Sequence, residues 1–135
     1  RLADAADYIL VDIPAEPLPE QEAVFRELDS VLIPVEAEYY GLDELSRTLQ
    51  KISEYEHLLI GGFVLTKAGR DSRAPREIET RLKEYFSSFI LNTVISRNYY
   101  LSVPVFSLTD LGGKGWHSGF IDYLKLANEL IEHEC

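Results

Sequence analysis

A single aspartate, Asp12, lies near the end of the otherwise apolar stretch Tyr8–Ile13. In an open parallel sheet, ligands bind beyond the carboxyl ends of the strands, so a polar residue at such a place is a candidate for chemistry. A carboxylate there can hold Mg²⁺ or a water of its shell, because this hard cation prefers oxygen ligands. The alternative is that Asp12 accepts a hydrogen bond from a loop amide.

A second acidic segment follows the apolar stretch Val31–Val35. It contains Glu36 and Glu38, with Tyr39 and Tyr40 directly after them. Paired carboxylates can do acid/base work, whereas the neighbouring aromatic side chains favour packing or an interface. Both interpretations stay open, with packing or an interface preferred.

Thr66 and Lys67 end a third apolar stretch, Leu59–Thr66, and Lys67 also begins the only basic cluster of the chain. The cluster holds six of the 13 bases: Lys67, Arg70, Arg73, Arg76, Arg81 and Lys83. Thr66 and Lys67 could meet a ligand at the end of a strand, or could lead into a solvated loop. The cluster could meet nucleic acid or form a solvated helix face.

Other kinds of site lack support in the sequence. His57, His117 and His133 do not stand at metal-ligand spacings from one another or from Cys135, and Cys135 is the only cysteine, so no zinc site or disulfide is predicted. No serine stands in a nucleophile elbow. The glycine-rich run Gly112–Gly115 is interpreted as a turn, because the phosphate-loop pattern G-x-x-x-x-G-K-[ST] is absent.

Composition predicts one soluble α/β domain over residues 1–135. The chain is 46% hydrophobic, and no apolar run reaches the roughly 20 residues that span a bilayer, so a cytoplasmic location without membrane contact is expected. The net charge of −10 lies in the first 60 residues, which hold 14 acids and 4 bases; the rest holds 9 of each. The absence of methionine suggests a fragment or a processed chain.

Strand and helix patterns alternate along the whole sequence. Strands are predicted at Tyr8–Ile13, Val31–Val35, Leu59–Thr66 and Phe89–Ile95, with a short fifth at Pro104–Leu108. Helices are predicted within Glu20–Leu28, from Asp43 to about Leu58, from Pro75 through Phe86, and after Gly115 to the end. Such alternation indicates βαβ units, and so a mainly parallel sheet with helices on both faces.

Several segments, taken in order, resemble the ParA/Soj-type partitioning ATPases. DYILVDIP at Asp7–Pro14 is similar to the family's strand that ends in Asp-x-Pro-Pro, and LIPVEAEYYGLDELSRTL at Leu32–Leu49 resembles its P-V-Q-A-E-Y-Y segment. VISRNYYLS at Val94–Ser102 resembles V-I-P-R-N-x-x-L-S. The bases from Arg70 to Arg76 fall where the family begins a basic helix. The resemblance runs from about Asp7 to Ile131.

The resemblance implies a P-loop NTPase fold of the SIMIBI class, with ATP and Mg²⁺ at a homodimer interface. It implies non-specific DNA binding by the ATP-bound form, a ParB-like activator and association with the nucleoid. Asp12 would serve Mg²⁺ and the attacking water. The remaining roles would be adenine contacts by Thr66, Lys67, Arg97, Asn98, Leu101 and Ser102, DNA contacts by Arg70, Arg73, Arg76 and Arg81, and dimer contacts by Glu38, Tyr39 and Tyr40.

The sequence departs from the family pattern in four places. The K-G-G-x-G-K-T phosphate loop is absent, Ala15 replaces the second proline, and Glu36 replaces a glutamine. Several residues are also missing between Ser102 and Pro104. Without the phosphate loop the chain alone is expected not to hydrolyse ATP. The strand that leads into that loop should lie between Tyr8–Ile13 and Val31–Val35, so its absence predicts a gap in the sheet. A preceding part of the polypeptide could fill the gap, a partner chain could fill it, or the strands could pair anew.

Two rival interpretations remain. A ParA-like interaction module could keep the fold and lose nucleotide binding, which the missing loop and Glu36 favour. A receiver-like phosphoacceptor domain would use Asp12, Thr66 and Lys67. The receiver interpretation is set aside, because it expects an acidic pair after the first strand and an acceptor aspartate after the third.

Overall fold

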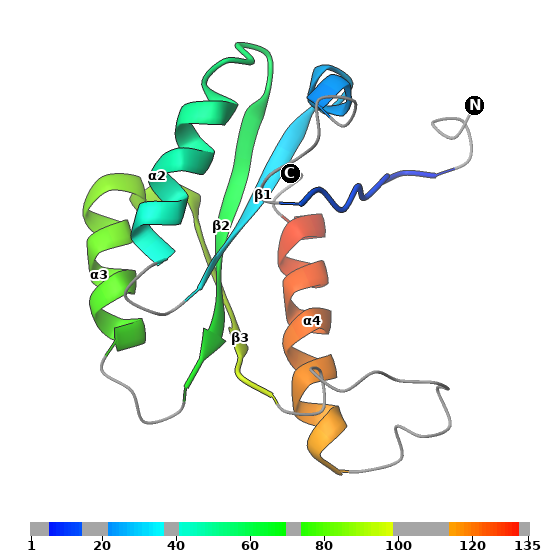
Figure 1. Ribbon diagram of the computed structural model, residues 1–135. Helices are drawn as coiled ribbons and strands as arrows, with labels where there is room; N and C mark the ends of the chain where they lie inside the picture. The colour runs from blue at the N-terminus through cyan, green and yellow to red at the C-terminus, as the bar shows by residue number, and fades with distance from the viewer. Residues whose placement is uncertain (1–5, 15–21, 37–40, 70–73, 99–113, 133–135) are drawn as a thin grey trace.

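The computed structural model describes residues 6–14, 22–36, 41–69, 74–98 and 114–132. Within these ranges a parallel sheet lies between helices on both faces, as predicted (Figure 1). The strands are β1 Ser30–Glu36, β2 Leu59–Ala68 and β3 Ile90–Ser96. The α-helices are α2 Gly41–Ile52, α3 Ala74–Phe86 and α4 Lys114–Glu132, with 3₁₀ turns η2 Ala23–Arg26 and η3 Ser87–Phe89.

The sheet has the order β1-β2-β3, and both pairs of strands are parallel. The β1–β2 register runs from Ser30 opposite Leu59 to Glu36 opposite Thr66, with one irregularity after Val31. Parallel strands that follow each other in the chain need a crossover connection. Helix α2 supplies it between β1 and β2, and α3 supplies it between β2 and β3. The carboxyl ends of all three strands therefore lie at one end of the sheet.

One face of the sheet carries the larger core. Ile33 and Val35 of β1 and Phe63 and Leu65 of β2 alternate inward and are almost fully buried. They pack with residues of α2, α3 and the 3₁₀ turn η2: Leu45, Ile52, Ile78, Leu82 and Phe25. Every second side chain of the strands and one face of each helix thus contribute to a single apolar layer.

The other face is covered by α4. Leu126 of this helix packs with Val64, Leu91 and Ile95 in a smaller core. Glu129, only 9% exposed, accepts hydrogen bonds from the backbone N–H groups of Asn92 (2.5 Å) and Thr93 (2.8 Å). These bonds hold the helix against β3.

A second carboxylate of α4 makes a similar contact further along β3. Asp122 accepts a hydrogen bond from the backbone N–H of Ser96 at 3.0 Å. Asp122 and Glu129 are seven residues apart and so lie on one side of the helix. Three N–H groups of β3 are therefore occupied by α4.

The predicted strand Tyr8–Ile13 is wrong: the described segment 6–14 is extended but joins no sheet. Ile13 packs on the larger core, whereas Tyr8, Ile9, Leu10 and Val11 are exposed. A strand needs a neighbour to bond its N–H and C=O groups. The segment also does not pair directly with β1, so the two did not join in the absence of the strand expected between them.

Smaller differences concern the lengths of elements. Of the helix predicted within Glu20–Leu28, residues 20 and 21 lie outside the described residues, Glu22 is helical, and Ala23–Arg26 form a 3₁₀ turn. Helix α2 ends at Ile52 instead of about Leu58. The strand predicted at Pro104–Leu108 lies outside the described residues. The other predicted strands and helices are confirmed within a few residues.

The hydrogen bonds to Glu129 predict a pH-dependent stability. Burial opposes ionisation of this carboxyl, but hydrogen bonds from the side chain of Thr93, from the N–H groups of Asn92 and Thr93, and from the side chain of Asn92 outweigh it. The pKa of Glu129 therefore lies below the ordinary value of 4.5. A lowered folded-state pKa means that the stabilisation is complete above the unfolded-state value and is lost as the pH falls through the folded-state value.

Glu129→Gln should therefore lower the free energy of unfolding at pH 7 by about 1.5–3 kcal/mol, the usual loss for hydrogen bonds to a charged group. The difference from the parent chain should shrink as the pH falls below 4.5. Urea unfolding at several pH values measures both effects. Glu132→Gln, at an exposed position of α4, is the control and should stay within about 0.5 kcal/mol. A difference between parent and Glu129→Gln that is independent of pH would contradict this account.

Candidate functional site

The predicted ligand residues at the ends of β1 and β2 do lie together. Thr66 is opposite Glu36 in the register, and its hydroxyl donates to the carbonyl of Val35 at 3.4 Å. Lys67 reaches back across the strands, and its ammonium group forms an ion pair with the Glu36 carboxylate. Both members of this pair are largely exposed. The edge thus presents a threonine, a lysine and a glutamate within reach of one ligand.

Lys67 has an unusual backbone. Its φ is 54°, which makes it the one non-glycine residue with positive φ in the described part of the chain. This left-handed conformation costs an ordinary L-residue roughly 1–2 kcal/mol. It coincides with the register irregularity between Leu65 and Ala68. Strained backbone conformations are common at functional sites. This one lies at the carboxyl end of a strand, which is the end where open parallel sheets bind ligands.

The end of β3 adds two further predicted residues to this edge. The backbone N–H of Arg97 donates to the carbonyl of Ala68 at 2.9 Å, which ties the exit of β3 to the exit of β2. Asn98 follows directly. Leu101 and Ser102 lie outside the described residues, as do Glu38, Tyr39 and Tyr40. Thr66, Lys67 and Arg97 therefore lie at the same end of the sheet, with Glu36 paired to Lys67.

Asp12 is not brought to this edge. It is exposed, and Figure 1 shows its segment, in blue, beside the sheet and away from the end where the strands finish. No group of three histidine, cysteine, aspartate or glutamate side chains within the described ranges could hold a metal ion. A single carboxylate still fits Mg²⁺ as phosphate-binding proteins hold it, with one or two carboxylates besides the phosphates. Its predicted role stays a prediction.

The basic cluster is partly neutralised on α3. Arg81 forms an ion pair with Glu77 at 3.3 Å, and Lys83 forms one with Glu79 at 2.5 Å, each one turn apart. Arg76 is exposed on the same helix. Arg70 and Arg73 lie outside the described residues. The described part of the cluster is a mixed-charge helix surface, and DNA binding stays a prediction.

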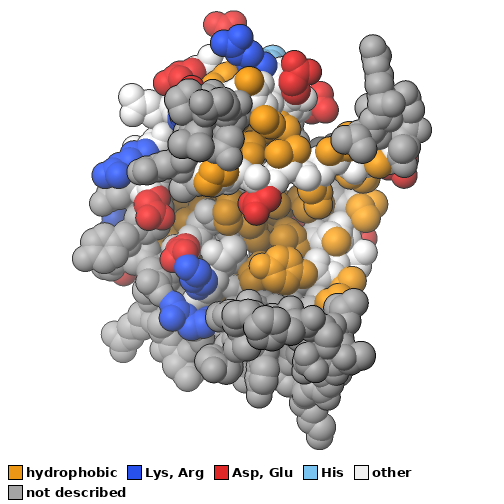
Figure 2. Space-filling view, turned by 45° about the vertical axis from the view of Figure 1, so that its right-hand side comes forward, with side chains coloured by type: hydrophobic (Ala, Val, Ile, Leu, Met, Phe, Trp, Pro, Cys, Tyr) orange, Lys and Arg blue, Asp and Glu red, His pale blue; other side chains and the backbone are white. Residues whose placement is uncertain are grey.

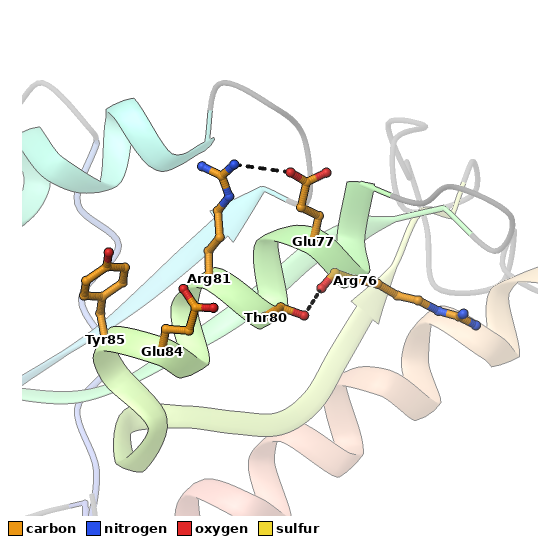
Figure 3. A pocket seen from close by; sticks show the side chains of 6 residues that line it. All are labelled: Arg76, Glu77, Thr80, Arg81, Glu84 and Tyr85. Atoms are coloured by element: carbon orange, nitrogen blue, oxygen red, sulfur yellow. Dashed lines mark hydrogen bonds and ion pairs between the residues drawn. The ribbon is translucent and has the colours of Figure 1, made fainter.

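A shallow hollow lies on this helix. Figure 3 shows its six lining side chains, all from α3: Arg76, Glu77, Thr80, Arg81, Glu84 and Tyr85. Arg81 points toward Glu77, whereas Arg76 extends away from this pair (Figure 3). Walls from one helix surface do not enclose a small molecule, so the hollow is a weaker candidate than the strand ends.

The sequence alone did not identify two features. Glu36 was considered for acid/base chemistry or packing, but the structure makes it the partner of Lys67. Asp122 and Glu129 were not singled out at all. Their spacing of seven, on the helix side that also carries Leu126, was the available signal.

Comparisons with known proteins give relatives but no family model, since none matches the chain. An uncharacterised protein of Pseudomonas putida is 30% identical over 98% of this chain and 53% of its own length. The chromosome-partitioning ATPase Soj of Treponema pallidum is 28% identical over 99% of this chain and 55% of its own. The sporulation initiation inhibitor protein Soj of Bacillus subtilis is 33% identical over 71% of this chain and 40% of its own.

The chain thus spans about half the length of the curated relatives that it matches over nearly all of its residues. In the part of the chain that the structure describes, no helix is both long and apolar enough to cross a membrane.

The left-handed backbone of Lys67 gives a test of the strand ends. Lys67→Gly and Lys67→Ala both remove the ion pair with Glu36, so their difference isolates the conformation. Glycine should give the more stable protein by about 1 kcal/mol, as judged by urea unfolding. The same two substitutions at Glu36, where φ is not positive, are the control. There the alanine variant should be more stable than the glycine variant. If alanine equals or exceeds glycine at Lys67, the backbone there is not strained.

Proposed function

We propose that this chain, which belongs to the ParA/Soj-type family of partitioning ATPases, supplies the C-terminal part of an ATP-dependent switch. In the complete switch, ATP would bring two copies together, and the dimer would bind DNA without sequence preference during chromosome or plasmid segregation. A ParB-like protein would stimulate it. The ATPase activity belongs by name to the Soj relative of Treponema pallidum.

The observation that carries the proposal is the set of polar residues at the carboxyl ends of three adjacent parallel strands. Glu36, Thr66 with Lys67, and Arg97 come from β1, β2 and β3 in turn. Open α/β sheets bind ligands at this end. The same residues fall in segments that resemble the family's nucleotide site.

This half of a site would bind the nucleoside and not the phosphates. Thr66 and Lys67 offer a hydroxyl and an ammonium group, and Arg97 lies across the exit of β3. The backbone nest that cradles phosphates at a helix N-terminus is absent from the sequence. When bound, Mg²⁺ would neutralise phosphate charge, with Asp12 as the carboxylate available to hold it or its water.

Asp12 would reach the nucleotide only if its segment becomes a strand of the sheet. That change would bring the carboxylate to the end of a strand parallel to β1, which is the place expected from the resemblance. Leu10, 91% exposed, and its apolar neighbours would be buried by the same step. The proposal therefore ties the catalytic carboxylate to completion of the sheet.

A second candidate function is a non-catalytic interaction module with the same fold. The pairing of Lys67 with Glu36 favours it, because Glu36 stands where the family has a neutral glutamine and already neutralises the lysine. A ligand would have to compete with this carboxylate. The two candidates differ in whether nucleotide binds at all.

Nucleotide binding separates the two. The 135-residue chain alone should hydrolyse no ATP, whereas a longer polypeptide with a K-G-G-x-G-K-T segment before Arg1 should bind Mg·ATP by calorimetry and hydrolyse it. In that polypeptide, Asp12→Asn should lower kcat about a hundredfold or more, as loss of a charge-stabilising group commonly does.

The control is Asp29→Asn, at an exposed position that precedes β1, which should leave kcat unchanged. A longer polypeptide that carries the phosphate loop but binds no Mg·ATP would favour the non-catalytic module. Unchanged kcat in Asp12→Asn would remove the catalytic role of Asp12.

A further inference from the structure

The register between β2 and β3 is irregular near the carboxyl ends of the strands. Leu65 lies opposite Val94, and Ala68 lies opposite Ser96, so β2 uses one more residue than β3 between these two pairs. The extra residue forms a β-bulge, a feature that redirects side chains and is common next to binding sites. The bulge contains Lys67, whose φ of 54° is left-handed. The direction of Lys67 therefore depends on the pair that closes the bulge, Ala68 with Ser96.

This closing pair stands at the end of both strands. Ala68 is the last residue of β2, and Ser96 is the last residue of β3. Directly after it, the N–H of Arg97 donates to the carbonyl of Ala68 at 2.9 Å. Strand ends open at little cost in free energy unless another contact holds them. Lys67, inside the bulge, and Arg97, just beyond it, therefore both depend on what holds Ser96.

Helix α4 provides this contact through Asp122, whose carboxylate accepts a hydrogen bond from the N–H of Ser96 at 3.0 Å. Seven residues later in the helix, Glu129 accepts one from the N–H of Thr93, which lies earlier in the strand. Seven residues of a helix and three of a strand both advance by about 10 Å. The helix therefore runs antiparallel beside β3 (Figure 1), with Glu129 near the middle of the strand and Asp122 at its end.

The two residues that depend on this contact carry charged side chains. Lys67 and Arg97 have long, flexible stems, so the place of each charged group is limited first by the backbone that bears it. Figure 2 shows acidic and basic side chains gathered just above the grey atoms at the lower left of the view, toward the end at which the strands finish in Figure 1. A fixed backbone at this end reduces the freedom that such groups would lose when a ligand binds.

We propose that Asp122 is a positioning residue for the candidate site: it holds Ser96, and through Ser96 it fixes Arg97 and the bulge that bears Lys67. The inference rests on the proposed function, in which these two side chains meet the nucleoside. A backbone N–H bonded to a carboxylate forms a charge-assisted hydrogen bond, which is stronger than a neutral one. Without Asp122, the N–H of Ser96 would have to bond to water, and the end of β3 would open more often.

Amide hydrogen exchange of the 135-residue chain, measured by NMR, tests the contact itself. Asp122→Ala should speed exchange of the Arg97 amide by about tenfold or more relative to the amides paired between β1 and β2, which report global folding. Asp122→Asn keeps an acceptor oxygen at the same place and should stay within about threefold of the parent chain. An Arg97 amide that exchanges at the parent rate in Asp122→Ala would overturn the proposal.

Glu129→Gln is the matched control, because Glu129 lies on the same side of α4 and bonds the same strand farther from the site. This variant should be less stable to urea than the parent chain, yet the exchange of Arg97 relative to the β1–β2 amides should not change. A purely structural role of α4 predicts a different result, in which both variants alter Arg97 in proportion to the stability that they lose. That result would contradict the positioning role of Asp122.

Ligand binding is measured in the longer polypeptide that carries the phosphate loop. Asp122→Ala should raise KM for ATP by about tenfold and leave kcat unchanged, the pattern of lost binding that is equal in ground and transition states. Glu129→Gln should leave KM unchanged. Faster exchange of Arg97 with an unaltered KM would contradict the link to the nucleoside. If the parent polypeptide binds no Mg·ATP, the proposed function fails, and the exchange of Arg97 alone then decides whether Asp122 holds the strand end.

Discussion

Hydrogen bonds between two carboxylates of α4 and the backbone of β3 fix how this helix lies on the sheet, and the smaller core depends on them. A buried carboxylate is costly unless several donors bond it. Glu129 satisfies this condition only where Asn92 and Thr93 offer their N–H groups. Together with Asp122, about two helical turns earlier, Glu129 fixes the rotation of the helix about its own axis. Leu126 is thereby set into the smaller core.

The parallel order of the strands places the candidate site at one end of the sheet. Within the described part of the chain no strand pairs with the outer edge of β1, and the segment that carries Asp12 joins no sheet. The carboxyl ends of β1, β2 and β3 nevertheless bring Glu36, Lys67 and Arg97 together. Under the proposed function these residues would form the nucleoside side of the site, and Asp12 would join it only in a complete sheet.

Periodicity predicted the central strands and long helices because their partners are local or generic apolar surfaces. Leu59–Thr66 needs only an apolar layer on each face, and α3 needs only one stripe. Tyr8–Ile13 has the same strand pattern but lacks a neighbour, and pattern alone cannot supply one. The Lys67–Glu36 pair and the bonds to Glu129 join residues more than 30 positions apart. Their geometry depends on register, which no local signal reveals.

Amide hydrogen exchange of the 135-residue chain, followed residue by residue by NMR at pH 7, tests this account most directly. The N–H groups of Asn92, Thr93 and Ser96 should be protected to about the same degree as those paired between β1 and β2, although no strand of the described chain lies beyond β3. Exchange of these three amides at the rate of an unprotected chain would contradict the closure of β3 by α4.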